Sequence, residues 1–253
     1  QLMLGVGAKK KTYLDDVFST YLYTGDDSSY RNINNGIDLA GEGGMVWVRP
    51  RNNTIGINVF DTVRGASKRL FAYANSAEGT DTSRLDQFNS NGFRVNGNYS
   101  TNGPSSYDYT SWTFRKSPMF DCVTWTGNSD TNQTISHSLS SIPGMIIAKR
   151  TDSSTTGDWV VYHRDHEGYL KLNSTAAAVS DSGAWTPVTS TSFKAYDYIN
   201  VNGASYVAYI FAGGESTAAT ARSVDFDGND YLSLTGHADL GFDTGDFTWE
   251  AWV

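Results

Sequence analysis

Cysteine is nearly absent from the sequence, which has only Cys122 among its 253 residues. A single cysteine excludes an intrachain disulfide and any zinc site built on several cysteine ligands. Long apolar runs are missing too, since no segment approaches the roughly 18 residues that a membrane-spanning helix requires. Residues 1–11 are too short in their apolar part, and carry their charges at the wrong end, for a signal peptide. We therefore expect no membrane insertion and a fold held by packing and strand pairing.

Charge is also scarce. Charged side chains make up 18% of the sequence, below the share of about a quarter that is usual for soluble domains. The 19 basic residues form no face that could follow a phosphate backbone, so nucleic-acid binding is not expected. What the sequence does have is 39% hydrophobic and 13% aromatic residues, which is typical of a folded chain.

The formal net charge of −8 is concentrated at one end of the sequence. Residues 223–253 contain seven acidic and no basic residues, which leaves 20 acids and 19 bases, a net charge of −1, to residues 1–222. The preceding segment, 212–221, has the small, polar composition of a linker. Residues 246–253 alternate in polarity like a strand and stop without a turn, so we expect the natural chain to continue beyond Val253.

Two stretches of about a hundred residues resemble each other. The matches form one collinear series: residues 18–25 with 120–127, 44–49 with 144–149, Arg64 with Arg164, Leu70 with Leu170, Phe93 with Phe193, and 109–114 with 206–211. Because the series is collinear, we predict a duplicated unit, with one copy in residues 14–116 and the other in residues 117–213.

Both copies show short strands separated by turns. In the second copy, the runs rich in Val, Ile, Tyr and Trp are residues 121–125, 145–149, 159–163, 169–172 and 205–211. Glycine-containing turn sequences separate them, and no window keeps apolar residues at helical spacing over three turns. We predict an all-β fold of two related antiparallel β-sandwich repeats, followed by an incomplete jelly-roll-like segment. A single larger sandwich or barrel shared by both copies is the alternative.

These boundaries divide the chain into five parts. We predict an N-terminal arm (1–13), two β-sandwich repeats (14–116 and 117–213), a linker (214–222) and the truncated start of a further domain (223–253). The three lysines at positions 9–11 make the arm a candidate attachment segment.

Two resemblances to known families bear on function. Residues 224–232 and 245–253 resemble the opening of a laminin-G-like, concanavalin A-like lectin domain. The repeat region is similar to an uncharacterised domain found in structural proteins of marine tailed phages, especially cyanophages. The matching segments are residues 13–25, 36–48, 60–65, 143–150 and 157–163. The resemblance covers most of residues 13–212 and implies a virion protein of the tail or its fibres, ending in a lectin-like domain.

The resemblance also implies partners and a location. It implies other virion proteins and host surface glycans as partners, a homotrimer by analogy with phage fibres, and a place in the phage tail. It implies neither an enzymatic activity nor a cofactor, so no catalytic residue is carried over. Two other hypotheses stay open: a carbohydrate-binding module of a secreted bacterial enzyme or adhesin, and a depolymerase whose catalytic carboxylates follow Val253.

Two clusters of metal-ligand side chains are better explained by turns. Residues 162–168 include two His, one Asp and one Glu, but their spacing matches no metal-binding motif, and the aligned stretch 63–67 has none of these ligands. Residues 225–230 are rich in Asp and Asn, yet Gly228 stands at the fourth position instead of the sixth that an EF-hand calcium loop needs. We predict a polar loop and a hairpin turn, and no metal site.

Aromatic side chains are the remaining candidates, since their rings can stack on sugars. Trp47, Trp112, Trp125 and Trp159 lie in strand patterns and are expected in the core or at a domain interface. Trp185 lies between turn residues, so we name it as the candidate glycan contact. The sequence contains no paired-carboxylate motif, nucleophile elbow or phosphate loop, and we predict no catalytic residues.

Overall fold

The computed structural model describes residues 13–130, 133–153, 157–181 and 185–213. Within these ranges the chain forms sixteen strands, two short 3-10 helices, η1 (Leu14–Asp16) and η2 (Asp197–Ile199), and no α-helix. Every paired strand in that part of the chain is antiparallel, so the predicted all-β class is confirmed. The predicted jelly-roll segment, the linker and nearly all of the arm lie outside the described residues.

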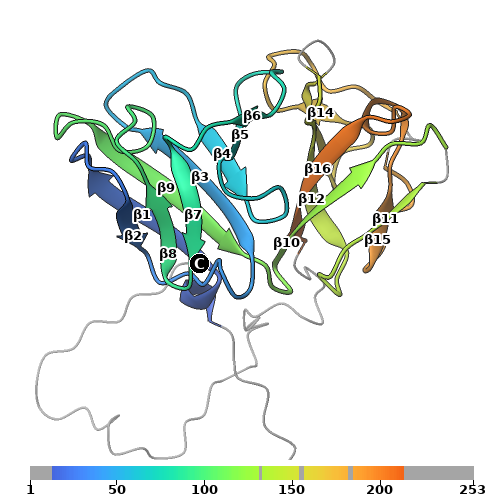
Figure 1. Cartoon of the computed structure of the whole chain (residues 1–253). Coiled ribbons are helices and arrows are strands. Elements are labelled where there is room, and N and C mark those ends of the chain that lie inside the picture. Colours follow the sequence, from blue (N-terminus) through green and yellow to red (C-terminus); the bar gives the residue numbers. More distant parts are fainter. Residues whose placement is uncertain (1–12, 131–132, 154–156, 182–184, 214–253) are drawn as a thin grey trace, which may run out of the picture. The chain divides into compact units, whose positions relative to one another are not determined.

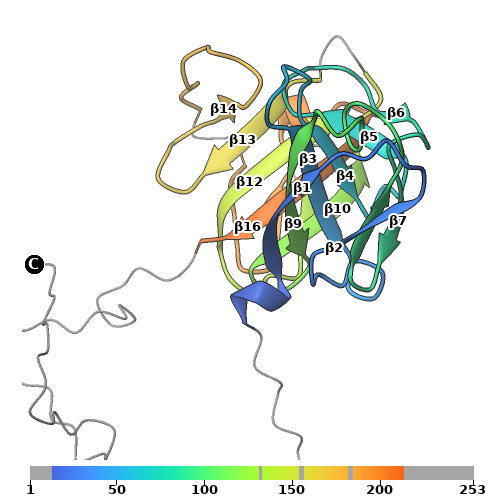
Figure 2. The same ribbon diagram turned by 90° about the vertical axis from the view of Figure 1, so that its left-hand side faces the viewer.

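The first repeat is a sandwich of two sheets (Figure 1). Its large sheet has the order β1 (Phe18–Thr24), β9 (Asp108–Arg115), β3 (Gly44–Pro50), β4 (Asn58–Asp61), β5 (Lys68–Phe71) and β6 (Gly79–Thr80). Its small sheet has the order β2 (Arg31–Asn34), β8 (Gly92–Val95) and β7 (Leu85–Asn89). The small sheet covers one face of the large sheet, as the side view in Figure 2 shows, and their facing side chains form one core.

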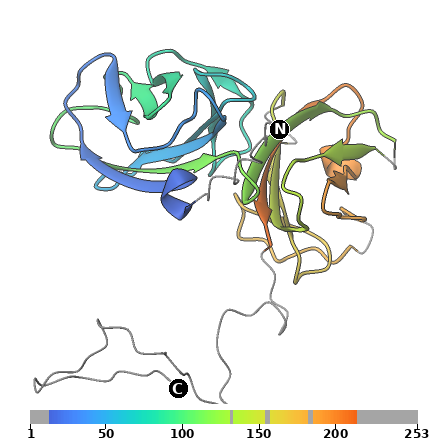
Figure 3. The same cartoon turned by 90° about the horizontal axis from the view of Figure 1, so that it is seen from below.

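The second repeat has the same plan with fewer strands (Figure 3). Its large sheet has the order β10 (Phe120–Thr126), β16 (Ser205–Ala212), β12 (Pro143–Arg150), β13 (Trp159–His163) and β14 (Leu170–Lys171). Its small sheet pairs β11 (Thr134–Ser136) with β15 (Ser192–Lys194). The order β10-β16-β12-β13-β14 repeats the order β1-β9-β3-β4-β5 strand by strand.

The residue pairing shows which of the sequence matches are structural. Leu70 pairs with Val59 and Leu170 with Val161, so these two leucines occupy equivalent positions. Arg64 and Arg164 do not. The backbone N–H of Arg164 donates to the Gly144 carbonyl. In the first repeat the N–H of Thr62 donates to the equivalent carbonyl of Gly44, so the counterpart of Arg164 is Thr62. The loop before β13 contains two residues more than the loop before β4, and the loop after β4 contains two more than its counterpart, so the copies are offset by 102 residues at β4 and by 100 at β3 and β5.

Three apolar cores hold these layers together. One lies inside each sandwich, around Phe93 in the first repeat and Phe193 in the second, and both side chains are fully buried. The third core joins the two large sheets through side chains of both repeats, among them Met45, Val59 and Trp159. The described residues between 13 and 213 accordingly belong to one compact unit. The two repeats are sandwiches of their own, as predicted, yet they also share a buried interface.

The shared interface explains why β3 is apolar on both faces. Val46 and Val48 point into the core of the first sandwich, whereas Met45 and Trp47 face the second repeat. A strand buried on both faces has an almost continuous apolar sequence instead of a strict alternation. Burying each such aliphatic side chain contributes on the order of 1.5–3 kcal/mol, so the interface is an integral part of the fold.

Candidate functional site

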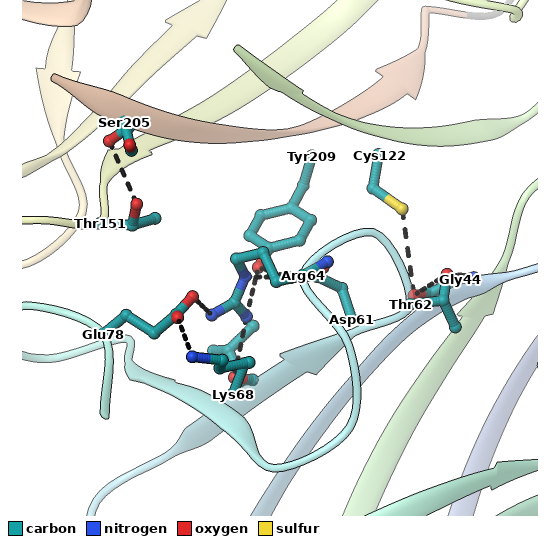
Figure 4. A network of polar contacts seen from close by, with 11 residues as sticks. Gly44, Asp61, Thr62, Arg64, Lys68, Glu78, Cys122, Thr151, Ser205 and Tyr209 are labelled. Atoms are coloured by element: carbon teal, nitrogen blue, oxygen red, sulfur yellow. Dashed lines mark hydrogen bonds and ion pairs between the residues drawn. The ribbon is translucent and has the colours of Figure 1, made fainter. Parts of the chain in front are cut away.

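The turn after β4 places a group of charged side chains at the interface between the repeats (Figure 4). Asp61 ends β4, and its carboxylate accepts a hydrogen bond from the backbone N–H of Arg64 at 2.9 Å. The Gly65 N–H donates to the Asp61 carbonyl, which closes the turn. A local turn therefore aims the Arg64 side chain back along β4 and toward the second repeat.

Arg64 joins both repeats through hydrogen bonds and ion pairs. Its Nε donates to Asp61 Oδ2 at 2.6 Å, and its Nη1 donates to Glu78 Oε2 at 3.0 Å. The Tyr209 hydroxyl, from β16 of the second repeat, donates to Asp61 Oδ2 at 2.6 Å and accepts from Arg64 Nη2 at 3.3 Å. Lys68 Nζ lies 3.3 Å from Glu78 Oε1. We call these five residues the Arg64 network.

Burial and pairing shape the electrostatics of the Arg64 network. The Asp61 side chain is fully buried and the Arg64 side chain is 4% exposed. Burial raises the pKa of Tyr209 well above its usual range, and the neighbouring Asp61 carboxylate raises it further. Burial alone would lower the pKa of Arg64, but Tyr209, Asp61 and Glu78 outweigh it and raise that pKa. Two carboxylates face two cations, so the buried charges compensate each other.

An open groove of about 470 Å³ lies beside the Arg64 network, between the two repeats. Its lining combines charged, hydroxyl and aromatic side chains: Val63, Arg64, Glu78, Thr124, Trp125, Thr126, Thr151, Ser205 and Tyr206. Thr124 and Thr126 lie on the edge strand β10 and are exposed. Such a lining can exchange hydrogen bonds with a hydroxyl-rich ligand, and we call it the inter-repeat groove.

The carboxylates of the Arg64 network do not form the pair that glycoside hydrolysis requires. That reaction needs two carboxyl groups that both reach the scissile bond. The Asp61 side chain has no solvent-exposed surface, and Glu78 is held by both Arg64 and Lys68. The geometry of the network therefore suits holding the repeats together and binding beside them.

Trp185, our candidate glycan contact, is not on the surface, and the expectation that it is exposed was wrong. Its side chain is 1% exposed and belongs to the core of the second sandwich. Its ring lies 5.8 Å from that of Phe193 and 6.1 Å from that of Tyr162. Both ring faces are covered by the protein, so Trp185 offers no stacking surface to a sugar.

The other tryptophans predicted to be structural are buried or half-buried. Trp159 is fully buried in the shared interface, where its indole N–H donates to the carbonyls of Phe71 at 2.9 Å and Ala74 at 3.2 Å in the first repeat. Trp125 stacks on Tyr206 at 5.2 Å between ring centroids. Both were expected in a core or at an interface, and that expectation is confirmed.

The histidine-rich stretch after β13 forms a turn. His163 ends the strand, the His166 N–H donates to the His163 carbonyl, and the Asp165 N–H donates to His163 Nδ1 at 3.3 Å. Among the residues that the structure describes, no three His, Cys, Asp or Glu side chains are grouped closely enough to hold a metal ion. Residues 225–230, the other cluster considered, lie outside the described residues.

The sequence contained only weak signals for the Arg64 network. Asp61 is the last residue of β4 and directly follows the apolar residues Val59 and Phe60, and a charge at the end of a buried strand is a site worth inspecting. No pattern pointed to Tyr209, because it lies 148 residues from the carboxylate that it contacts. No helix in the described part of the chain is both long enough and apolar enough to span a membrane.

The fold and the site define an all-β protein built from two fused sandwiches with a buried ionic network between them. A family model described as a domain of unknown function, DUF7483, matches residues 14–218. The chain therefore belongs to this family. No curated protein and no solved structure matches the chain.

Proposed function

We propose that this protein is a non-enzymatic structural component of a phage virion, located in the tail or its fibres, where it contributes to host attachment. The resemblance of residues 13–212 to structural proteins of marine tailed phages supports this function. It also supports a homotrimeric assembly with other tail proteins as partners.

The shared interface is the observation that favours a structural role. Met45, Val59 and Trp159 belong to one core that continues from the first repeat into the second. Arg64 and Tyr209 add buried polar contacts across the same interface. Two sandwiches joined in this way resist bending better than two domains on a linker, because bending would expose the core and separate paired charges. This resistance to bending is consistent with a place in a tail fibre or stalk.

The test is the location of the protein during infection. We expect peptides of this chain in density-purified particles, and antibody raised against the full chain should label the tail in electron micrographs. Native mass spectrometry of the full chain should give a trimer. Secretion of the chain by uninfected bacteria, together with its absence from purified particles, would refute the virion assignment.

The inter-repeat groove favours a second candidate function, that of a carbohydrate-binding module of a secreted enzyme or adhesin. Its hydroxyl groups and the Glu78 carboxylate match the hydrogen-bonding capacity of sugars. The two candidates differ in genetic context and location: a catalytic domain on the same chain would favour the module, and neighbouring phage structural genes would favour the virion protein.

A further inference from the structure

A row of amide side chains covers the outer face of the small sheet in the first repeat. Along β2, Ile33 is buried whereas Asn32 and Asn34 are exposed. Gln87 on β7 is exposed and Asn89 is half-buried. Successive side chains of a strand alternate between the two faces of its sheet. The residues that point away from the core therefore gather their amides on one surface.

Gly92, the first residue of the central strand β8, leaves this surface without a side chain next to the β7–β8 turn. It pairs with Asn34 on one side and with Asn89 on the other. Its φ is +128°, and a Cβ atom there would lie 2.0 Å from the Ile33 carbonyl oxygen, so only glycine fits.

An open groove of about 460 Å³ lies on this face, within the range of about 300–1,000 Å³ that ligand sites occupy. We call it the amide groove. Its polar lining includes Asn32, Asn34, Gln87, Asn89, Asn91 and Arg94.

Arg94 is held in a fixed orientation beside the amides. Its Nε and Nη2 donate to the two carboxylate oxygens of Asp86, each at 2.9 Å. Its guanidinium lies 4.9 Å from the centre of the Tyr30 ring, and Tyr30 is 66% exposed. A bidentate ion pair and a cation–π contact together reduce the conformational entropy that Arg94 would lose on binding a ligand.

The charges and hydrogen bonds of the amide groove define the chemistry of its ligand. Arg94 is neutralised by Asp86, and the remaining polar side chains are uncharged: five amides and the hydroxyl of Ser90. In the described part of the chain, the side chains of Asn34 and Gln87 make no hydrogen bond to protein, so their donors and acceptors face solvent. An amide offers a donor and an acceptor side by side, which matches the adjacent hydroxyl groups of a sugar.

We propose that the amide groove binds a neutral polysaccharide. This assigns a glycan-binding site to the first repeat, whereas the sequence had indicated Trp185 in the second repeat and a lectin-like domain from residue 223. The inference does not depend on the chain being part of a virion.

The second repeat provides an internal control, because its small sheet has only β11 and β15. On the face equivalent to the amide groove, β11 exposes Thr134 and Ser136. Within the described residues, no third strand supplies a counterpart of Gln87 and Asn89. The amide groove is therefore a property of the first repeat and not of the duplicated plan.

Affinity electrophoresis of the full chain tests the proposal, with mannan, dextran and galactan as neutral probes and alginate as an acidic one. The variant Asn34→Ala/Gln87→Ala removes two exposed amides that hold nothing in the fold, so its melting temperature should equal that of the parent chain. Ser136→Ala on the second repeat and Thr124→Ala in the inter-repeat groove are the matched controls.

We expect at least one neutral polysaccharide to retard the parent chain. The double variant should raise the dissociation constant about tenfold or more, and both controls should leave it unchanged. The proposal is overturned if no neutral probe retards the chain, if alginate alone does so, or if Thr124→Ala weakens binding as much as the double variant. The location of the protein in purified particles is measured separately, so either assignment can fail without the other.

Discussion

Replacing Tyr209 with phenylalanine removes a single oxygen atom from the interface between the repeats. That hydroxyl donates to Asp61 Oδ2 at 2.6 Å, and both side chains are fully buried. Hydrogen bonds to a charged group contribute about 1.5–3 kcal/mol to stability. Asp61 keeps its contacts to the Arg64 backbone and Nε, so no carboxylate is left without partners. We expect Tyr209→Phe to lower the free energy of unfolding by about 1.5–3 kcal/mol.

For a unit of this size, about 1 kcal/mol shifts the melting temperature by roughly 2–4 °C. The expected decrease is therefore about 3–12 °C. Urea titration followed by circular dichroism measures the free energy directly. Hydrogen exchange measured by mass spectrometry shows which segments unfold. Peptides from both repeats should lose protection at the same urea concentration. Tyr21→Phe is the matched control, since Tyr21 is 36% exposed and should change stability by no more than about 0.5 kcal/mol.

Asp61→Ala extends the test to the whole network. It leaves Arg64 buried with its main partner removed, and breaking a buried pair in this way costs about 3–5 kcal/mol. The double variant Asp61→Ala/Tyr209→Phe should lose less stability than the sum of the losses in the two single variants, because both substitutions remove the same hydrogen bond. Strict additivity, or a loss of protection confined to the second repeat, would refute the view that the Arg64 network couples the repeats.

Three further predictions concern other buried positions. A Cβ atom on Gly127 would lie 2.2 Å from the Val201 carbonyl oxygen, so Gly127→Ala should cost about 1–3 kcal/mol in urea titrations, whereas Thr126→Ala should be nearly neutral. Burial lowers the pKa of Lys149 from 10.5 to about 8. Between pH 8 and pH 10.5 the unfolded chain binds more protons than the folded chain, so the free energy of unfolding should rise with pH in this range. Lys149→Met should flatten that rise, and an unchanged slope in the variant would contradict this prediction. Burial raises the pKa of the Cys122 thiol, so a thiol reagent should react with it rapidly in concentrated urea and only slowly in the native protein at pH 8.

The strands were predictable because their signals are local. The run 159–163 appears as β13 with the same bounds, and the run 205–211 is one residue shorter than β16. The run 169–172 was too long for one strand, since only Leu170 and Lys171 pair with β13, whereas Tyr169 forms an isolated bridge with Val179. A pattern of apolar residues shows where a strand can form, but the neighbouring strand decides how much of it is paired.

Trp185 shows what such local reasoning misses. Its neighbours in the sequence are turn formers, which suggested an exposed position. The side chain is buried because Tyr162 on β13 and Phe193 on β15 cover it, and both lie on strands outside the local turn. The Arg64 network was missed for the same reason, because Tyr209 reaches Asp61 only once both large sheets have formed. Tertiary contacts of this kind leave no periodic signal in the sequence.

The two copies differ in the residues with which they meet. By strand pairing, His163 occupies the position of Asp61, since they pair with Met145 and Met45 respectively. Trp112 likewise occupies the position of Tyr209. His163 is exposed and Trp112 is half-buried, so these two counterparts do not repeat the buried contact between Asp61 and Tyr209. The interface is therefore asymmetric: the first repeat supplies the carboxylate of Asp61 and the second supplies the hydroxyl of Tyr209. Two copies of the first repeat, or two of the second, could not form this hydrogen bond, because either the buried hydroxyl or the buried carboxylate would be missing.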